Sequence, residues 1–192
     1  DLQLNPDYLP EFLKYSRVFG TGTLIKGVKK IPPASIITIN MDGVILNKQI
    51  YWQPRPRPKD RSISYFVDRL SEIFPKVVKE RITNEHSYGL LLSGGTDSRF
   101  VLSQMNTPVT CFHLNESVDG NKEAETAFQT TKISGDKFYF LRRNRDYYPK
   151  VMEKVRPLIN FNGKFNQAPA VGIEDEIYNE VDILFSGQYS DT

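Results

Sequence analysis

The segment Ser93-Gly94-Gly95-Thr96-Asp97-Ser98 carries residue types that can bind a phosphate group. Its adjacent glycines allow a tight turn that brings backbone N–H groups close to an anion, and a following helix would direct its positive end there. The hydroxyls of Ser93 and Ser98 can donate hydrogen bonds to phosphate oxygens. Asp97 would repel the anion unless a divalent cation lies between them, so the segment predicts phosphate together with Mg²⁺. The structural alternative is a glycine-rich turn in which Asp97 caps a helix.

The surrounding pattern places this segment between a strand and a helix. Residues 89–92 form a short apolar run, and a helical pattern follows over residues 98–105. The alternation continues, with strands expected over 109–114, 137–141 and 181–185 and helices over 122–133 and 146–158. Such alternation predicts an α/β fold, a parallel sheet flanked by helices. In such a sheet ligands bind at the carboxyl ends of the strands, where Ser93–Ser98 lies.

The first third of the chain has a different character. Residues rich in β-branched side chains flank an Asp42-Gly43 turn, which predicts a β-hairpin over 35–47. Prolines alternate with basic residues over 54–59, so we expect an extended linker that ends near residue 58, with a proline-rich ligand for a partner domain as the alternative. Apolar residues then recur at helical spacing over 66–82, a helix that Pro75 can kink.

The composition narrows the class of protein. Of 192 residues, 39% are hydrophobic and 25% charged, and the formal net charge is +2. This small surplus argues against a dedicated nucleic-acid or membrane-surface binder, and no apolar run approaches the ~20 residues that cross a bilayer. The single cysteine, Cys111, excludes an intramolecular disulfide and agrees with a cytoplasmic location. Because the first residue is Asp1, we expect a processed product or part of a longer chain.

Three segments resemble known families. Ser93–Ser98 resembles the SGGxDS pyrophosphate-binding loop (PP-loop) of the ATP-pyrophosphatase superfamily, whose members adenylate a substrate oxygen and release pyrophosphate. Residues 22–34, followed by Asp42-Gly43 and Tyr51-Trp52, are similar to the end of the glutaminase domain in glutamine-dependent asparagine synthetases. Residues 184–191 resemble the L-S-G-E-G-x-D-E strand and loop of that family. The three segments follow the family's order and extend over about residues 18 to 192.

The resemblance implies a fold and a reaction. The fold would be an adenine nucleotide alpha-hydrolase-like sheet over residues 59–192, preceded over 1–58 by the hairpin and linker that end a glutaminase domain. In this family an aspartate carboxylate attacks the α-phosphate of ATP, and ammonia from glutamine then displaces AMP. The implied ligands are ATP, Mg²⁺, aspartate or another carboxylate, and ammonia. No nucleic acid or membrane is implied, and a homodimer is a further expectation.

The resemblance also assigns site residues. The pyrophosphate cradle is matched by Ser93, Gly94, Gly95 and Ser98. Positions that hold Mg²⁺ are matched by Asp97 and Asp191. Positions that line the adenosine pocket are matched by Leu92, Leu114, Ser186 and Gly187. Plain strand packing explains the two leucine side chains equally well, because the family makes these contacts largely through the backbone.

Three departures from the family leave the acceptor open. The family's loop glutamate, thought to assist at the acyl centre, is Gln188 here, and the next acidic position is Thr192. The family's more distal lysine and acidic residues would lie beyond residue 192. The glutaminase nucleophile is an amino-terminal cysteine, so this chain alone should not hydrolyse glutamine, and no catalytic residue is assigned. The alternatives are a relative that adenylates another carboxylate, which Gln188 favours, and a nucleotide-binding module without catalysis.

Minor candidates have simpler interpretations. Cys111 with His113 could form a thiol site, but a small buried thiol is commoner. Glu123 aligns with an acidic position near the start of the family's second helix, and favourable charge at a helix amino terminus explains it equally well. The arginines within 142–145 could meet phosphates or a substrate carboxylate, although a solvated basic turn is preferred.

Overall fold

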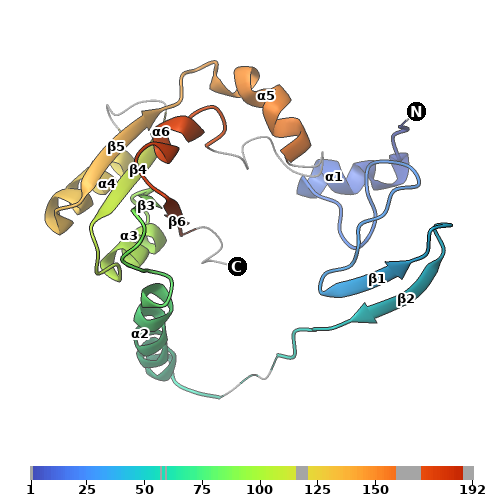
Figure 1. Ribbon diagram of the computed structural model, residues 1–192, viewed down its shortest axis with the longest axis horizontal. Helices are drawn as coiled ribbons and strands as arrows, with labels where there is room; N and C mark the ends of the chain where they lie inside the picture. Colours follow the sequence, from blue (N-terminus) through green and yellow to red (C-terminus); the bar gives the residue numbers. More distant parts are fainter. Residues whose placement is uncertain (1, 57, 59, 116–120, 159–169, 188–192) are drawn as a thin grey trace. The chain divides into compact units, whose positions relative to one another are not determined.

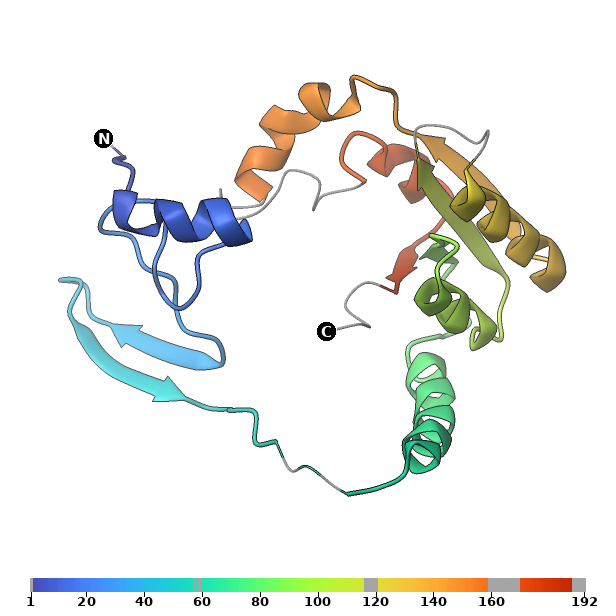
Figure 2. The same cartoon turned by 180° about the vertical axis from the view of Figure 1, so that it is seen from behind.

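The computed structural model describes residues 2–56, 58, 60–115, 121–158 and 170–187. These residues divide into two compact units, one within residues 1–60 and 154–167 and the other within 61–153 and 168–192. Figures 1 and 2 show the elements of each unit from opposite sides. The assignment of residues 1–58 to a glutaminase domain and of 59–192 to a synthetase domain stays a prediction.

A four-stranded parallel sheet organises the second unit. Its strands are β3 (Tyr88–Leu91), β4 (Val109–Asn115), β5 (Lys137–Arg142) and β6 (Ile183–Ser186), in the order β5-β4-β3-β6. All three neighbouring pairs are parallel. Leu91, at the end of β3, pairs with Phe112 on one side and with Ser186 on the other. The predicted parallel α/β sheet is therefore confirmed.

Helices flank this sheet, and the alternation of side chains along the strands divides the core into two clusters. The helices that pack on the sheet are α2 (Ile63–Lys79), α3 (Thr96–Ser103), α4 (Lys122–Ser134) and α6 (Glu174–Tyr178), and a further helix, α5 (Tyr147–Leu158), follows β5. One cluster joins Leu90, Leu92 and Cys111 to side chains of α2, α3 and α4. The other joins Phe112 and Leu141 to Ile177 of α6 and its neighbours. The sheet is thus covered on both faces, as parallel sheets require.

Local chemistry sets where these helices begin and end. Asn121 caps α4, because its side chain accepts hydrogen bonds from the backbone N–H of Glu123 at 3.0 Å and of Ala124 at 3.2 Å. Gly135, with φ of 79°, ends the same helix in the left-handed conformation. Helix α2 ends at Lys79 rather than at the predicted residue 82, since the N–H of Ile82 bonds to the carbonyl of Lys79 in a tighter turn.

The start of β6 and the helix before it differ from the sequence prediction. The expected strand began at Val181, but the N–H of Val181 bonds to the carbonyl of Ile177 and completes the turn after α6. The strand therefore begins at Ile183. Helix α6 was not predicted, because its five residues span little more than one helical turn.

The first unit contains the predicted hairpin. Strands β1 (Ser35–Ile39) and β2 (Ile45–Ile50) pair antiparallel. The Asn40 side chain accepts hydrogen bonds from the N–H groups of Asp42 and Val44, and Gly43 has φ of 80°. The unit also holds a 3-10 helix, η1 (Pro6–Tyr8), and α1 (Leu9–Tyr15), which the sequence analysis did not predict. Across the described residues, no helix combines the length and apolar character needed to cross a membrane.

Candidate functional site

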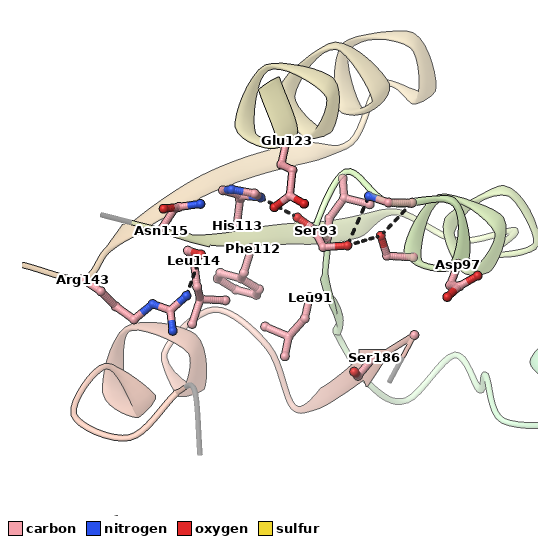
Figure 3. Close-up of a pocket in the computed structure, with 14 residues that line it drawn as sticks. Leu91, Ser93, Asp97, Phe112, His113, Leu114, Asn115, Glu123, Arg143 and Ser186 are labelled. Carbon is pink, nitrogen blue, oxygen red and sulfur yellow. Dashed lines mark hydrogen bonds between the residues drawn. The ribbon is translucent and has the colours of Figure 1, made fainter. Parts of the chain in front are cut away.

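A pocket of about 420 Å³ lies in the second unit where the strands end (Figure 3). Most of its lining comes from the carboxyl ends of β3, β4 and β6 and from the starts of α3 and α4. The lining residues are Leu91, Leu92, Ser93, Gly95, Asp97, Ser98, Phe112, His113, Leu114, Asn115, Glu123, Arg143, Ser186 and Gly187. The pocket is therefore at the edge of the sheet where the sequence placed the phosphate-binding segment.

The strand order explains why the pocket forms here. From β3 the chain moves to β4 and then to β5, whereas β6 returns to the other side of β3. Ligands bind open α/β sheets in the crevice at such a switch point, outside the carboxyl ends of the strands. In this sheet the crevice lies between β3 and β6. It brings the loop after Leu91 opposite Ser186.

Two glycines allow the backbone to close around this crevice. Gly94 has φ of +83°, and a Cβ there would lie 2.4 Å from the carbonyl oxygen of Glu123 at the start of α4. A Cβ on Gly187 would lie 3.0 Å from the backbone nitrogen of Ser98, so the end of β6 packs against the first turn of α3. At Gly94 both the conformation and the contact require glycine.

The two serine hydroxyls of the loop lie side by side. Ser93 Oγ and Ser98 Oγ are 3.1 Å apart, and Ser93 Oγ also accepts from the Gly95 N–H at 3.2 Å. Ser98 is 4% exposed and its hydroxyl donates to the carbonyl of Gly95. Hydroxyl hydrogens rotate freely about the C–O bond, so both groups can turn to donate to an incoming phosphate oxygen.

Helix α3 presents an uncapped amino terminus to the pocket. Its N-cap is Gly95, and no side chain caps the helix. The alternative in which Asp97 caps the helix is therefore wrong, since Asp97 lies within the first turn. The N–H groups of the first turn and the positive end of the helix dipole favour an anion at this position. The loop and helix together fit a phosphate group.

Asp97 is the predicted magnesium ligand that the structure describes. It is exposed and lines the pocket. Asp191, its predicted companion, lies outside the described residues, as do Gln188 and Thr192. No cluster of three or more metal-ligating side chains occurs in the described part of the chain. The Mg²⁺ ligand set stays a prediction, with one carboxylate placed beside the phosphate loop.

Histidine 113, which the sequence analysis paired with Cys111, belongs to the pocket. His113 Nδ1 lies 2.8 Å from the carbonyl oxygen of Leu92, and the ring is 2% exposed. Cys111 instead packs in the core, where burial raises the pKa of its thiol to about 12. A thiol with such a pKa stays protonated at neutral pH, so a buried structural cysteine is the correct interpretation.

Arg143 also lines the pocket, and its interpretation as part of a solvated turn is wrong. Its Nη2 donates to the carbonyl of Leu114 at 2.9 Å, and its Nη1 donates to the hydroxyl of Tyr148 at 3.1 Å. The guanidinium lies 5.8 Å from the centre of the Tyr147 ring. These contacts hold a positive charge at the end of the pocket near β5, where a carboxylate or phosphate could bind. Its neighbours Arg142 and Arg145 are exposed and do not line the pocket.

The structure gathers the predicted binding residues around one pocket. All of those described line it except Gly94, which lies within the same loop. Sequence reasoning assigned no role to Leu91, Phe112 or Asn115. It preferred structural explanations for His113 and Arg143, and it left two equal explanations for Glu123. The signal available for His113 and Arg143 was proximity to the ends of β4 and β5, and for Glu123 it was a place in the first turn of α4. Their roles as ligand contacts stay predictions.

Comparison with known proteins finds a relative in sequence. No protein-family model matches the chain. The asparagine synthetase [glutamine-hydrolyzing] 1 of Bacillus subtilis (strain 168) is 25% identical over 138 residues, which cover 70% of this chain and 22% of that protein. The chain therefore spans less than a quarter of the length of this relative. Together with the SGGxDS loop, the match supports the ATP-pyrophosphatase superfamily.

Three solved structures are partly similar. The NH3-dependent NAD synthetase of Campylobacter jejuni has a TM-score of 0.42 at 14% identity, and covers 61% of this chain and 54% of its own. A predicted subunit of tRNA methyltransferase from Methanocaldococcus jannaschii has a TM-score of 0.37 at 24% identity, with coverages of 55% and 54%. The NMN synthetase of Francisella tularensis has a TM-score of 0.34 at 14% identity, with coverages of 65% and 64%. At these TM-scores we derive nothing further from the likenesses.

Proposed function

We propose that this chain contributes the nucleotide-binding site of an ATP-dependent amidotransferase of the asparagine synthetase type, a ligase. The observation that carries the proposal is the Ser93–Ser98 loop, which opens an uncapped helix at the switch point of the sheet. The sequence relative and the order of the three motifs support it. A cytoplasmic location and a homodimer accompany the proposal as predictions.

In this proposal, different residues of the pocket bind different parts of ATP. Backbone N–H groups of the loop and the hydroxyls of Ser93 and Ser98 would hold the pyrophosphate, where negative charge accumulates as the bond to the α-phosphate breaks. Bound Mg²⁺ would neutralise part of that charge, with Asp97 among its ligands. Leu92, Leu114, Ser186 and Gly187 would line the adenosine part of the site.

The reaction requires a carboxylate at the α-phosphate. A carboxylate oxygen forms a bond to the α-phosphorus while the bond to the pyrophosphate oxygen breaks, which gives an acyl adenylate. Ammonia then forms a C–N bond at the acyl carbon, and AMP leaves. In this proposal the chain would hold the phosphates at the carboxyl end of β3, where the close backbone contacts of Gly94 and Gly187 shape the loop.

The acceptor carboxylate is aspartate in the first form of the proposal. Gln188 in place of the family's glutamate favours a second form, in which another carboxylate is adenylated, because an amide side chain cannot serve as a general acid or base. Arg143 gives either acceptor a cation within the pocket. A module that binds nucleotide without catalysis would need the same loop.

The decisive experiment measures products in the complete polypeptide that carries this sequence. With MgATP, aspartate and ammonium, we expect AMP, pyrophosphate and asparagine in equal amounts, and none of them from the Asp97→Asn variant. AMP and pyrophosphate formed only with a different carboxylic acid would establish the second form. MgATP binding without pyrophosphate release under any of these conditions would leave only a binding module.

A further inference from the structure

Among the residues that the structure describes, His113 is a buried side chain of the pocket with one ring nitrogen that has no hydrogen-bond partner. Its Nδ1 lies 2.8 Å from the carbonyl oxygen of Leu92. A carbonyl oxygen only accepts hydrogen bonds, so Nδ1 must carry the hydrogen. In the neutral ring Nε2 is then an acceptor, and none of the described residues donates to it. Buried polar atoms normally have partners, and one without a partner in the free protein points to a partner that binds.

The position of the ring limits what that partner can be. His113 lines the pocket, and Leu92, which receives the Nδ1 bond, directly precedes Ser93 at the start of the phosphate loop. The imidazole ring therefore lies beside the start of that loop, with Nδ1 facing Leu92 and Nε2 on the other side of the ring. Figure 3 shows His113 on β4 and Glu123 on α4 reaching toward the same part of the pocket. The partner must be close to a phosphate held by the loop.

The charged groups nearby do not fill this role. Ionised carboxylates are acceptors only, so neither Glu123 nor Asp97 can donate to a neutral Nε2. Arg143 is a donor, but its guanidinium lies toward the end of the pocket near β5, where it bonds to the Leu114 carbonyl and the Tyr148 hydroxyl (Figure 3). A nucleoside triphosphate offers two kinds of donor, the ribose hydroxyls and the amino group of the base. The ribose ring is joined to the α-phosphorus through only the 5′ methylene and its ester oxygen, whereas the amino group is at the far edge of the base.

We propose that His113 Nε2 accepts a hydrogen bond from a ribose hydroxyl of the bound nucleotide and so selects ribonucleotides over deoxyribonucleotides. The inference rests on the proposed nucleotide-binding function and adds a residue that determines specificity. The bond from Nδ1 to Leu92 fixes the ring and its tautomer, in the way that a partner on one imidazole nitrogen sets the role of the other. The preference follows because a missing hydroxyl leaves the buried acceptor unpaired.

The test compares four nucleotides on the complete polypeptide that carries this sequence. Equilibrium binding is measured for the Mg²⁺ complexes of ATP, 2′-deoxyATP, 3′-deoxyATP and purine riboside triphosphate, which lacks the amino group. We expect one of the two deoxynucleotides to bind about 2- to 10-fold more weakly than ATP, as expected for one lost hydrogen bond. Loss of the amino group should cost less. If the amino group matters and both hydroxyls do not, the proposal is wrong.

Two variants separate the roles of the ring nitrogens. In His113→Asn the amide nitrogen can replace Nδ1 as donor to Leu92, but no atom replaces Nε2, so we expect equal affinity for ATP and the deoxynucleotide. In His113→Gln the longer amide can reach the position of Nε2, and part of the preference should remain. Circular dichroism and thermal unfolding check that each variant is folded. If a variant does not fold, the comparison of the four nucleotides on the unsubstituted protein still tests the proposal.

Several outcomes would overturn the inference. An unchanged preference in His113→Asn would show that another group reads the ribose, and an equal loss for all nucleotides would show a packing role alone. Nitrogen NMR of the imidazole in the ATP complex should show Nε2 without a hydrogen. A doubly protonated ring would mean that His113 donates to a phosphate instead. If MgATP itself does not bind, the proposed function fails first, and that result is distinct from binding without sugar preference.

Discussion

Gly94 shows how one residue can decide whether the loop forms. Two features disfavour any side chain at this position. The backbone has φ of +83°, and an added Cβ would lie 2.4 Å from the carbonyl oxygen of Glu123. Gly135 in the same unit has φ of +79° with open space around it. A substitution at Gly135 therefore tests the left-handed conformation alone, whereas one at Gly94 tests the conformation and the contact together. We expect Gly135→Ala to lower the free energy of unfolding by about 1–2 kcal/mol from the left-handed backbone alone. Gly94→Ala should cost more and also abolish MgATP binding.

Urea unfolding of the two glycine variants measures this difference. Equal losses in Gly94→Ala and Gly135→Ala would show that the chain near Glu123 moves aside without cost. Retained MgATP binding in Gly94→Ala would contradict the assignment of this loop to the phosphates.

Cys111 gives a prediction about pH. Burial raises the pKa of its thiol from 9.0 to about 12, so between these values the folded chain holds a proton that the unfolded chain releases. The associated stability is present below pH 9 and is lost as pH rises toward 12. Each pH unit in that window should cost up to about 1.4 kcal/mol from this group.

The measurement compares the natural chain with Cys111→Ala by urea unfolding at pH 8 and pH 10. Lysines and tyrosines titrate in both proteins, so the difference between the two slopes isolates the thiol. The natural chain should lose more stability over this interval, and identical slopes would show that the thiol is accessible to water.

At the residue scale, the sequence predicted what a local pattern encodes. Ser93, Asp97 and Ser98 stand in one short motif, so their proximity follows from the chain itself. His113 and Arg143 are placed by bonds to the carbonyls of Leu92 and Leu114, which depend on how strands pair. No local pattern carries that information, so structural explanations were preferred for both.

At the element scale, periodicity predicted the strands and longer helices of the second unit to within a few residues. The predictions differ from the structure at the ends of these elements, because local hydrogen bonds determine their first and last residues. One example is the turn after α6, which makes β6 begin at Ile183. Helices α1 and α6 are seven and five residues long. Segments this short repeat an apolar face at most once or twice, so periodicity cannot distinguish them from loops.

Removal of the Asn121 cap of α4 should affect both the stability of the helix and the binding of nucleotide. Asn121 accepts from two backbone N–H groups, whereas Ser62 at the start of α2 accepts from one at 3.3 Å. We expect Asn121→Ala to lower the free energy of unfolding by about 1 kcal/mol. Because α4 begins where Gly94 packs, MgATP affinity should fall as well.

Ser62→Ala is the matched control for this cap. It removes a cap from a helix that contributes nothing to the pocket lining, so its stability loss should leave MgATP affinity unchanged. Thermal unfolding and nucleotide titration of both variants give the two readouts. A fall in affinity for Ser62→Ala equal to that for Asn121→Ala would indicate a general effect of lost stability.

At the scale of the whole molecule, the sequence pattern does not predict the order of the strands in the sheet. Alternating strands and helices predict a parallel sheet, but several orders satisfy that alternation. The order β5-β4-β3-β6 pairs β6 with β3, which brings Ser186 and Gly187 to the phosphate loop although the loop lies far earlier in the chain. The family resemblance implied this proximity, and tertiary hydrogen bonding between β3 and β6 provides it.

Ligand binding links this site to the stability of the molecule and gives a prediction about metal. Asp97 stands beside the loop as an exposed carboxylate, so it should oppose free ATP and favour MgATP. With EDTA present, Asp97→Asn should bind ATP several-fold more tightly than the natural chain. With Mg²⁺ in excess the order should reverse, because the variant has lost a ligand for the metal.

Thermal shifts at fixed nucleotide concentration follow this reversal, since a ligand that binds the folded chain raises its unfolding temperature by mass action. Asp68→Asn on α2 removes the same charge from a position outside the pocket and should not change the order of the two conditions. A weaker interaction of Asp97→Asn with ATP in both conditions would mean that Asp97 supports the fold of the loop. Tighter binding in both would mean that it opposes phosphate without holding a metal, and the Mg²⁺ assignment would then move away from this carboxylate.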